Sequence, residues 1–398
     1  MTHLRRVMAA NFFAATGFGL YASGSAVYYT RFTGLTASEV GIGLTVAGLG
    51  WLPLSVVIGR FCDRVQARRA VVLTGALGAV LLLSAIAIRG FWSFLIVVTA
   101  VQMAVQAAWI CREALVADLT DEGSRVTLSS RLRSLFNAGI IAGTGLGGLL
   151  LGADRRSAYL ALMIGCAAAE LVAVLLSLGL PRPVAEIPPS AGLSMRGALR
   201  DVPYLALAGL HGVLAIGDII LFVGLPLWLV SQAGLSVALA AWLYGLNALI
   251  VIVLQVRLSR AAESFGGALR LLIGAGVVST TACLVIAFSD DTTMAVGVPL
   301  LMLAVALLSV GEIWASAAGW KFRFDLAPAA AQGTWGGVFA LGGSVHLVLG
   351  PVLVTLLVER FDAAGWIVLS TLFLAVSATA GSALDWARRT RPSAAVVA

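Results

Sequence analysis

The sequence predicts an all-α polytopic membrane protein, with twelve transmembrane helices in two pseudo-symmetric halves of six. Of its 398 residues, 60% are hydrophobic and only 11% are charged, whereas soluble domains have about 45–50% and about 25%. The mean hydropathy is +1.00. The apolar runs are continuous, which favours helices, because the strands of a membrane barrel alternate apolar and polar residues. Soluble enzymes, nucleic-acid-binding proteins and disordered scaffolds are therefore excluded.

Charged and turn-rich points divide the first half of the chain into six apolar segments of about 20 residues, the length needed to cross a bilayer. The first segment begins after Arg5 and Arg6 and is longer than the core of a signal peptide, so we expect it to be retained. The third and fourth are separated only by Arg89 and Gly90. The expected spans are 7–30, 38–58, 70–88, 91–111, 134–152 and 157–179.

A proline-rich connection follows the sixth span and predicts two domains, 1–180 and 204–398, joined by a cytoplasmic linker at 181–203. A weak internal repeat supports this division, because Gly143-Thr144 and Gly350-Pro351 occupy matching places about 200 residues apart. Parallel six-helix repeats are typical of the largest transporter fold. The expected spans of the second half are 204–230, 235–256, 267–288, 294–319, 335–358 and 363–385.

Basic residues lie mostly on one side of the expected spans. Twenty-one of the 26 Lys and Arg residues fall on one side and five on the other. Because cytoplasmic loops are enriched in Lys and Arg, we expect a multi-pass protein of the bacterial inner (cytoplasmic) membrane with both termini in the cytoplasm. The same bias explains the formal net charge of +7, so no nucleic-acid partner is needed.

The loop after the second span contains a run that resembles the G-x-x-x-D-R-x-G-[RA]-R-[RK] signature of the major facilitator superfamily. This run reads Gly59-Arg60-Phe61-Cys62-Asp63-Arg64-Val65-Gln66-Ala67-Arg68-Arg69, with Gln66 in place of the second glycine. The resemblance implies that Gly59 permits close helix approach and that Asp63 faces the N-terminus of a neighbouring helix. It further implies a cytoplasmic gate made of Gly59, Asp63, Arg64, Arg68 and Arg69 together with Arg112 and Asp118, from the passage between spans four and five. Alternatively, the arginines only set the topology.

Span five carries four glycines that resemble the G-x-x-x-G-P-x-x-G-G motif of the superfamily's antiporters. They are Gly139, Gly143, Gly147 and Gly148, and Thr144 stands at the place of the proline. Glycines at these spacings give a smooth helix face against a partner helix. The resemblance favours antiport, and ordinary packing of small residues is the alternative.

Acids inside the expected spans are the leading candidates for proton and substrate binding, because a charge in lipid is costly and usually functional. Asp218 lies in span seven with His211 two turns earlier, and Glu312 lies in span ten beside Trp314. In the superfamily, spans one, four, seven and ten line the central cavity, so the resemblance places both acids there. A buried carboxylate can bind and release a proton as the cavity changes sides. A hydrogen-bonded structural acid is the alternative for each.

Span one carries no acid and offers aromatic side chains instead, among them Tyr21, Tyr28 and Tyr29. In span four, Gln102 resembles the glutamine of the exporters' R-x-x-Q-G motif, although that motif's arginine and glycine are missing. An aromatic, weakly polar cavity with one or two carboxylates suits lipophilic substrates, cations among them.

These features indicate a secondary transporter and not an enzyme. We expect export of a small lipophilic drug or secondary metabolite in exchange for protons, by alternating access. The alternatives are an uptake carrier or uniporter of the same fold, and a transport-inactive sensor or scaffold. No run resembles a nucleotide-binding loop, and the four cysteines are widely spaced, so no cofactor, metal site or disulfide is expected. The resemblance implies a monomer in the lipid bilayer.

Overall fold

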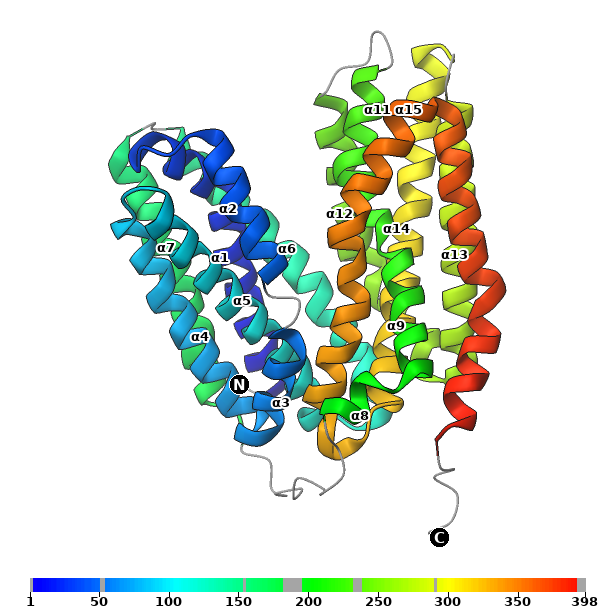
Figure 1. Cartoon of the computed structure of the whole chain (residues 1–398), viewed down its shortest axis with the longest axis horizontal. Helices are drawn as coiled ribbons and strands as arrows, with labels where there is room; N and C mark the ends of the chain where they lie inside the picture. The colour runs from blue at the N-terminus through cyan, green and yellow to red at the C-terminus, as the bar shows by residue number, and fades with distance from the viewer. Residues whose placement is uncertain are drawn as a thin grey trace. The chain divides into compact units, whose positions relative to one another are not determined.

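The computed structural model describes residues 3–50, 54–152, 155–181, 195–231, 238–289 and 292–391, and no strand occurs among them. The helices of the first half are α1 (His3–Phe32), α2 (Ala37–Gly50), α3 (Leu54–Val65), α4 (Ala67–Ser84), α5 (Phe91–Leu119), α6 (Arg125–Leu151) and α7 (Arg156–Leu178). Those of the second half are α8 (Met195–Leu199), α9 (Val202–Leu214), α10 (Ile216–Ile219), α11 (Leu225–Ser231), α12 (Ala238–Leu258), α13 (Phe265–Phe288), α14 (Met294–Asp325) and α15 (Gln332–Arg389) (Figure 1). The short elements are 3₁₀ turns η1 (Ala85–Ala87), η2 (Glu122–Ser124), η4 (Arg260–Glu263) and η5 (Ala329–Ala331), and the π-helix η3 (Ile220–Gly224).

The helical prediction is confirmed, and the described parts of all twelve expected spans fall on these helices. Within the described ranges, eight helices are long and apolar enough to cross a membrane, or nine if α2 and α3 form one bent span. The expected number of twelve transmembrane helices is therefore compatible with the structure but stays a prediction. The expected boundary at 181–203 falls largely on residues outside the described ranges, so the division into 1–180 and 204–398 also stays a prediction.

Two of the expected spans are merged in α15, which is 58 residues long. The helix turns back on itself at Asp362, whose backbone is not helical (φ 46°, ψ −126°). Figure 1 shows the two arms, orange before the turn and red after it. Close by, a Cβ on Gly365 would overlap the carbonyl group of Leu357, so only glycine fits in this tight turn.

The chain forms two compact units, which are not simply its two halves. Unit 1 contains residues 1–121, 131–195 and 329–337, and unit 2 contains residues 122–130, 196–328 and 338–398. The first turns of α6 thus belong to unit 2, and the first turns of α15 belong to unit 1.

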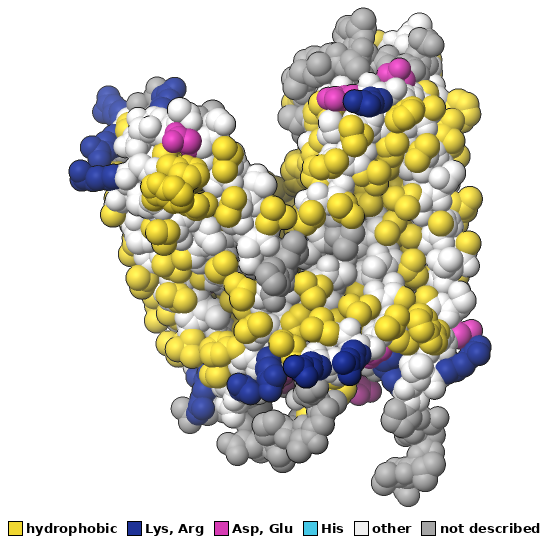
Figure 2. All heavy atoms as spheres, viewed as in Figure 1, with side chains coloured by type: hydrophobic (Ala, Val, Ile, Leu, Met, Phe, Trp, Pro, Cys, Tyr) yellow, Lys and Arg dark blue, Asp and Glu magenta, His cyan; other side chains and the backbone are white. Residues whose placement is uncertain are grey.

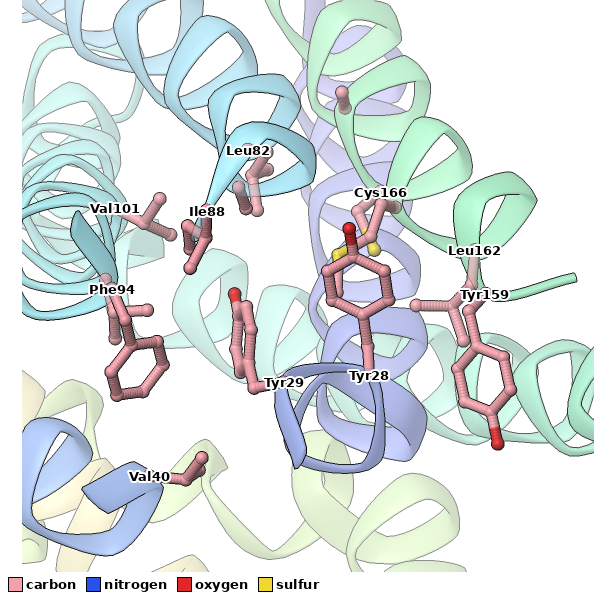
Figure 3. Close-up of a cluster of buried hydrophobic side chains, with 14 of the residues drawn as sticks. Tyr28, Tyr29, Val40, Leu82, Ile88, Phe94, Val101, Tyr159, Leu162 and Cys166 are labelled. Atoms are coloured by element: carbon pink, nitrogen blue, oxygen red, sulfur yellow. The ribbon is translucent and has the colours of Figure 1, made fainter. Parts of the chain in front are cut away.

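In unit 1, α1 packs along α7, and α4 packs against both α5 and α7. One end of this bundle holds a cluster of buried aromatic and aliphatic side chains (Figure 3). At its centre, the ring of Tyr29 lies edge-on to Phe94, with the ring centroids 4.8 Å apart. Burial of such large side chains stabilises the packing of the helices.

In unit 2, α14 packs against α9, α12 and α13. Here α9 and the first arm of α15 also approach closely, since a Cβ on Gly212 would overlap the carbonyl oxygen of Gly342. Small residues at such contacts are typical of packed membrane helices. Trp228 and Trp366 are fully buried and make an edge-to-face contact with ring centroids 5.8 Å apart.

The outside of both units is apolar over the middle of the helices. On the face shown in Figure 2, hydrophobic side chains cover the helices, and Lys, Arg, Asp and Glu gather near their ends. The most exposed large hydrophobic side chains are Leu149, Trp242 and Phe288, each more than three-quarters exposed. Soluble monomers rarely expose apolar surface on this scale, so the chain is a multi-pass membrane protein.

Candidate functional site

Asp63, in the last turn of α3, binds the N-terminus of α15. Its Oδ1 accepts a hydrogen bond from Gly333 N at 2.7 Å, and its Oδ2 accepts hydrogen bonds from Thr334 N at 2.7 Å and Thr334 Oγ1 at 2.5 Å. The first N–H groups of a helix have no partner within the helix, and the helix dipole favours an anion there. Asp63, Gly333 and Thr334 all belong to unit 1. Asp63 therefore lies at the N-terminus of another helix, as the resemblance implied.

Glycines make this approach possible. A Cβ on Gly59 would overlap the carbonyl oxygen of Gly333, and a Cβ on Gly333 would lie 2.6 Å from Asp63 Oδ1. Gln66, which replaces the motif's second glycine, has a φ of 74°. A left-handed backbone is costly for a residue other than glycine, by roughly 1–3 kcal/mol. Gln66 therefore replaces the motif's glycine at a position whose positive φ favours glycine.

Arg68, another residue of the implied gate, contacts α7. Arg68 donates to the carbonyl oxygens of Ser177 (3.4 Å) and Leu178, at the C-terminus of α7. A cation is favourable at this end of a helix. Three further residues of the set, Arg64, Arg69 and Asp118, are exposed.

Arg112, on α5, forms an ion pair with Glu170 of α7, with 2.6 Å between Nη2 and Oε1. The two side chains are 17% and 11% exposed. Gly75 of α4 lies against the pair, because a Cβ there would be 3.0 Å from Glu170 Oε1. Arg112 is thus joined to an acid inside the bundle of unit 1, and this contact joins α5 to α7.

Three of the four glycines of α6 lie against α1. A Cβ on Gly139 would be 2.6 Å from the carbonyl oxygen of Phe12, and a Cβ on Gly143 or Gly147 would overlap atoms of α1. Gly148 has open space around it. At the place of the motif's proline, the Thr144 hydroxyl donates to the carbonyl oxygen of Ile140 at 2.9 Å. The glycine face therefore allows close packing of α6 on α1.

Asp218 lies where the seventh expected span is irregular. The α-helix is interrupted at Ala215, Asp218 follows in the single turn of α10, and the π-helix η3 begins two residues later. A π-helical turn inside a span is uncommon and frequently marks a functional site. Asp218 is half-buried, and so is His211, two turns earlier. The His211 ring packs against α14 at Gly319 and against Phe339, whose ring centroid is 5.4 Å away.

Glu312, on α14, receives a hydrogen bond from the Asn247 amide of α12, with 3.0 Å between Nδ2 and Oε2. The same Nδ2 lies 3.0 Å from Ser309 Oγ. Trp314, two residues further along α14, packs on α13, since a Cβ on Gly274 would be 2.9 Å from its ring. Neither Asn247 nor Ser309 was singled out from the sequence. An amide near the middle of the apolar span 235–256 was the available signal.

Most of the tyrosines of α1 belong to the packed interior of unit 1. Tyr28 and Tyr29 are at most 2% exposed, so the expectation that they line an open cavity is wrong (Figure 3). Tyr21 is half-buried, and its hydroxyl lies 3.1 Å from that of Tyr29. Gln102 is half-buried on α5. Large aromatic rings are buried here because they fill the end of the bundle between α4, α5 and α7.

A family model described as the Major Facilitator Superfamily matches residues 7–351 of the chain. No curated protein matches the sequence. Among solved structures, a bacterial homologue of the iron transporter ferroportin is 16% identical, with 98% of this chain and 100% of that chain covered and a TM-score of 0.74.

Two further solved structures are similar along the whole chain. A proton:xylose symporter of the same superfamily is 12% identical, covers 96% of both chains and has a TM-score of 0.75. A human organic anion transporter is 17% identical, with 95% of this chain and 98% of that chain covered and a TM-score of 0.68. At these identities the likeness shows the fold alone.

Proposed function

Because the chain belongs to the major facilitator superfamily, whose members are transporters, we propose that it is a proton-coupled exporter of a small lipophilic drug or secondary metabolite. It would act as a monomer in the bacterial inner membrane, with both termini in the cytoplasm, as the distribution of Lys and Arg indicates. Its two halves would expose a central site to each side in turn.

The observation that carries this proposal is the acid inside α14. Glu312 lies 18 residues after the start of the helix and 13 before its end, which is roughly 27 Å and 20 Å at about 1.5 Å per residue. A carboxyl group at this depth is costly and usually functional. Its hydrogen bond to the neutral amide of Asn247 leaves that partner unchanged when the carboxyl group gains or loses a proton.

Asp218 is the second candidate for proton or cation binding. It lies between the interruption of the α-helix at Ala215 and the π-helix that begins at Ile220. Transporters often bind substrates and ions at interruptions of this kind, because backbone groups are freed there. The sequence pairs these carboxylates with aromatic side chains such as Trp314 and Tyr21 in the expected cavity-lining spans, a composition that favours lipophilic cations as substrates.

The contact of Asp63 with Gly333 and Thr334 is the candidate cytoplasmic gate. We expect it to break and form again during transport, because it joins the α3–α4 connection to the helix that carries on into unit 2. The close packing of α6 on α1 supports antiport only through the resemblance of its glycine motif.

Inside-out vesicles with an acid interior provide the test. Lipophilic cations and antibiotics are added one at a time, and the pH gradient is followed for wild type, Asp218→Asn and Glu312→Gln. Asp385→Asn, which changes an exposed acid near the end of α15, is the matched control. We expect a compound that collapses the gradient in the wild type and in the control, and an effect at least about tenfold smaller in one of the other variants.

The other outcomes identify the alternatives. Labelled compound that equilibrates across the membrane without moving the pH gradient would indicate a uniporter. Accumulation in the opposite direction would indicate uptake. If no labelled compound crosses in any condition and Asp218→Asn leaves the cellular phenotype intact, the protein is a sensor or scaffold.

A further inference from the structure

Three polar side chains meet inside unit 2, between α12 and α14. Asn247 is 6% exposed and Ser309 is fully buried, while Glu312 is half-buried. Asn247 is nine residues from the start of α12 and eleven from its end, so it lies roughly 13–17 Å from either end of the helix. Ser309 and Glu312 are three residues apart and share one face of α14.

Ser309 determines which way the Asn247 amide points. The Ser309 hydroxyl donates its only proton to the carbonyl oxygen of Val305, at 2.7 Å, so towards Asn247 it can only accept a hydrogen bond. The atom that faces it at 3.0 Å must therefore be the amide nitrogen and not the amide oxygen. This network removes the usual ambiguity between the two ends of an asparagine side chain.

The same nitrogen carries a second hydrogen, and Glu312 Oε2 lies 3.0 Å from it. Oε2 can accept this hydrogen bond as an oxygen of the carboxylate. It can also accept it as the carbonyl oxygen of the acid, provided that the proton is carried by Oε1. The hydrogen bond can thus persist in both protonation states, and only one of the two carboxyl oxygens has to change.

We propose that Asn247 is a positioning residue for Glu312, whose amide, oriented by Ser309, holds Oε2 and directs the transported proton to Oε1. This inference rests on the proposed function, because it assumes that Glu312 carries the proton. In a medium of low dielectric constant such hydrogen bonds are strong and directional. Without the amide, Oε2 loses this hydrogen-bond donor.

The chain contains a matched control for this amide. Asn11 of α1 is also 6% exposed, but its Nδ2 donates to the backbone carbonyl oxygen of Leu132, at 2.8 Å. Asn247→Leu and Asn11→Leu therefore make the same change at the same burial, and only the first removes a donor from a carboxyl group. Any general effect of the substitution on folding affects both.

The first measurement is the infrared C=O stretching band of protonated Glu312, obtained at low pH as the difference between each protein and its Glu312→Gln counterpart. A carbonyl oxygen that loses a hydrogen-bond donor absorbs at a higher wavenumber. We expect the band to move up in Asn247→Leu and to stay in place in Asn11→Leu. A band that stays in place in Asn247→Leu would overturn the proposal.

Ser309→Ala provides a second, milder variant, which remains informative if Asn247→Leu does not fold. It removes the acceptor that orients the amide, so part of the molecules should have the amide turned away from Glu312. We expect the band to broaden towards higher wavenumber. An unchanged band in this variant would also contradict the proposed orientation of the amide by Ser309.

The second measurement is substrate-driven proton movement in the inside-out vesicles. We expect a loss of about tenfold or more in Asn247→Leu, and no further loss when it is combined with Glu312→Gln, because the two residues act as one unit. If Glu312→Gln moves protons like the wild type, the proposed function fails at Glu312, whatever the infrared band shows. If Glu312→Gln is inactive and Asn247→Leu is as active as Asn11→Leu, the proposed function stands and the positioning role of Asn247 fails.

Discussion

Each of the two units holds a glutamate between two of its long helices, but the two glutamates have different partners. In unit 1, Glu170 is bound by the guanidinium group of Arg112 at 2.6 Å. In unit 2, Glu312 is bound by the amide of Asn247 at 3.0 Å. Protonation of Glu170 would leave the buried cation of Arg112 without its anion, which is costly. Protonation of Glu312 leaves no uncompensated charge on Asn247, because the amide is neutral.

The difference teaches which of the two acids is suited to carry a proton. An acid with a cationic partner joins two helices through an ion pair, which is lost if the acid becomes neutral. An acid that is oriented by a neutral donor can change its charge without stranding that donor. The proposal that Glu170 is structural and that Glu312 carries a proton rests on these partners, since both acids lie within apolar helices.

The largest effect is expected from Arg112→Met, which leaves Glu170 as a buried, unpaired anion. The free energy of unfolding should fall by about 3–5 kcal/mol, as measured by unfolding with sodium dodecyl sulfate in mixed micelles. The double variant Arg112→Met/Glu170→Met should recover most of the loss, because no buried charge remains. If Asn247→Leu, for which about 1–3 kcal/mol is expected, destabilises more than Arg112→Met, the comparison between the two units breaks down.

A smaller effect is expected from Gly75→Ala, which tests how tightly unit 1 holds its glutamate. The added Cβ would lie 2.7 Å from Val174 Cγ2 and 3.0 Å from Glu170 Oε1, so both side chains have to shift and the ion pair with Arg112 is disturbed. We expect a loss of about 1–3 kcal/mol in the same unfolding assay. Gly78→Ala is the control, because its Cβ would meet only Ala104 Cβ, at an ordinary 3.8 Å. Equal effects of the two variants would show that the ion pair is not tightly confined.

The smallest effect is expected from Asp201→Asn, which tests whether an ion pair at the ends of helices contributes less than the Arg112–Glu170 pair inside the bundle. Asp201 and Arg391 form an ion pair at 2.7 Å with side chains 19% and 21% exposed, near the ends of their helices. Asparagine keeps an acceptor for Tyr204 N but loses both the charge and the oxygen that accepts from Arg391. We expect a loss of about 0.2–1 kcal/mol that diminishes in high salt. A loss as large as that of Arg112→Met would contradict this ranking.

Sequence reasoning was most successful where the signal is local. Continuous apolar runs predict helices, and the motif around Asp63 identifies the family before any contact is known. It also implies that Asp63 lies at the N-terminus of another helix, which the structure shows at Gly333 and Thr334. Such inferences succeed because hydropathy and the spacing of glycine, aspartate and arginine are properties of a single segment.

Contacts between distant segments were not accessible in this way. The sequence offers no reason for Arg112 to meet Glu170 and not Asp63, since all three lie near the ends or middles of apolar helices. The same holds for Asn247 and Glu312, which are 65 residues apart, and for the burial of Tyr28 and Tyr29. These pairings depend on how each helix is rotated about its own axis when it packs.

By itself, the sequence determined that this is an all-helical membrane protein of the major facilitator superfamily, with few acids inside its apolar segments. The helical membrane class follows from composition and length, which govern the burial of uncharged side chains in lipid. The family follows from the resemblance of the motif around Asp63. Only the tertiary structure decided that Glu170 faces a cation, that Glu312 faces an amide, and that Asp218 lies beside a π-helix. The reason is that the partner of a buried polar group is chosen by the packing of neighbouring helices, to which residues far apart in the chain contribute equally.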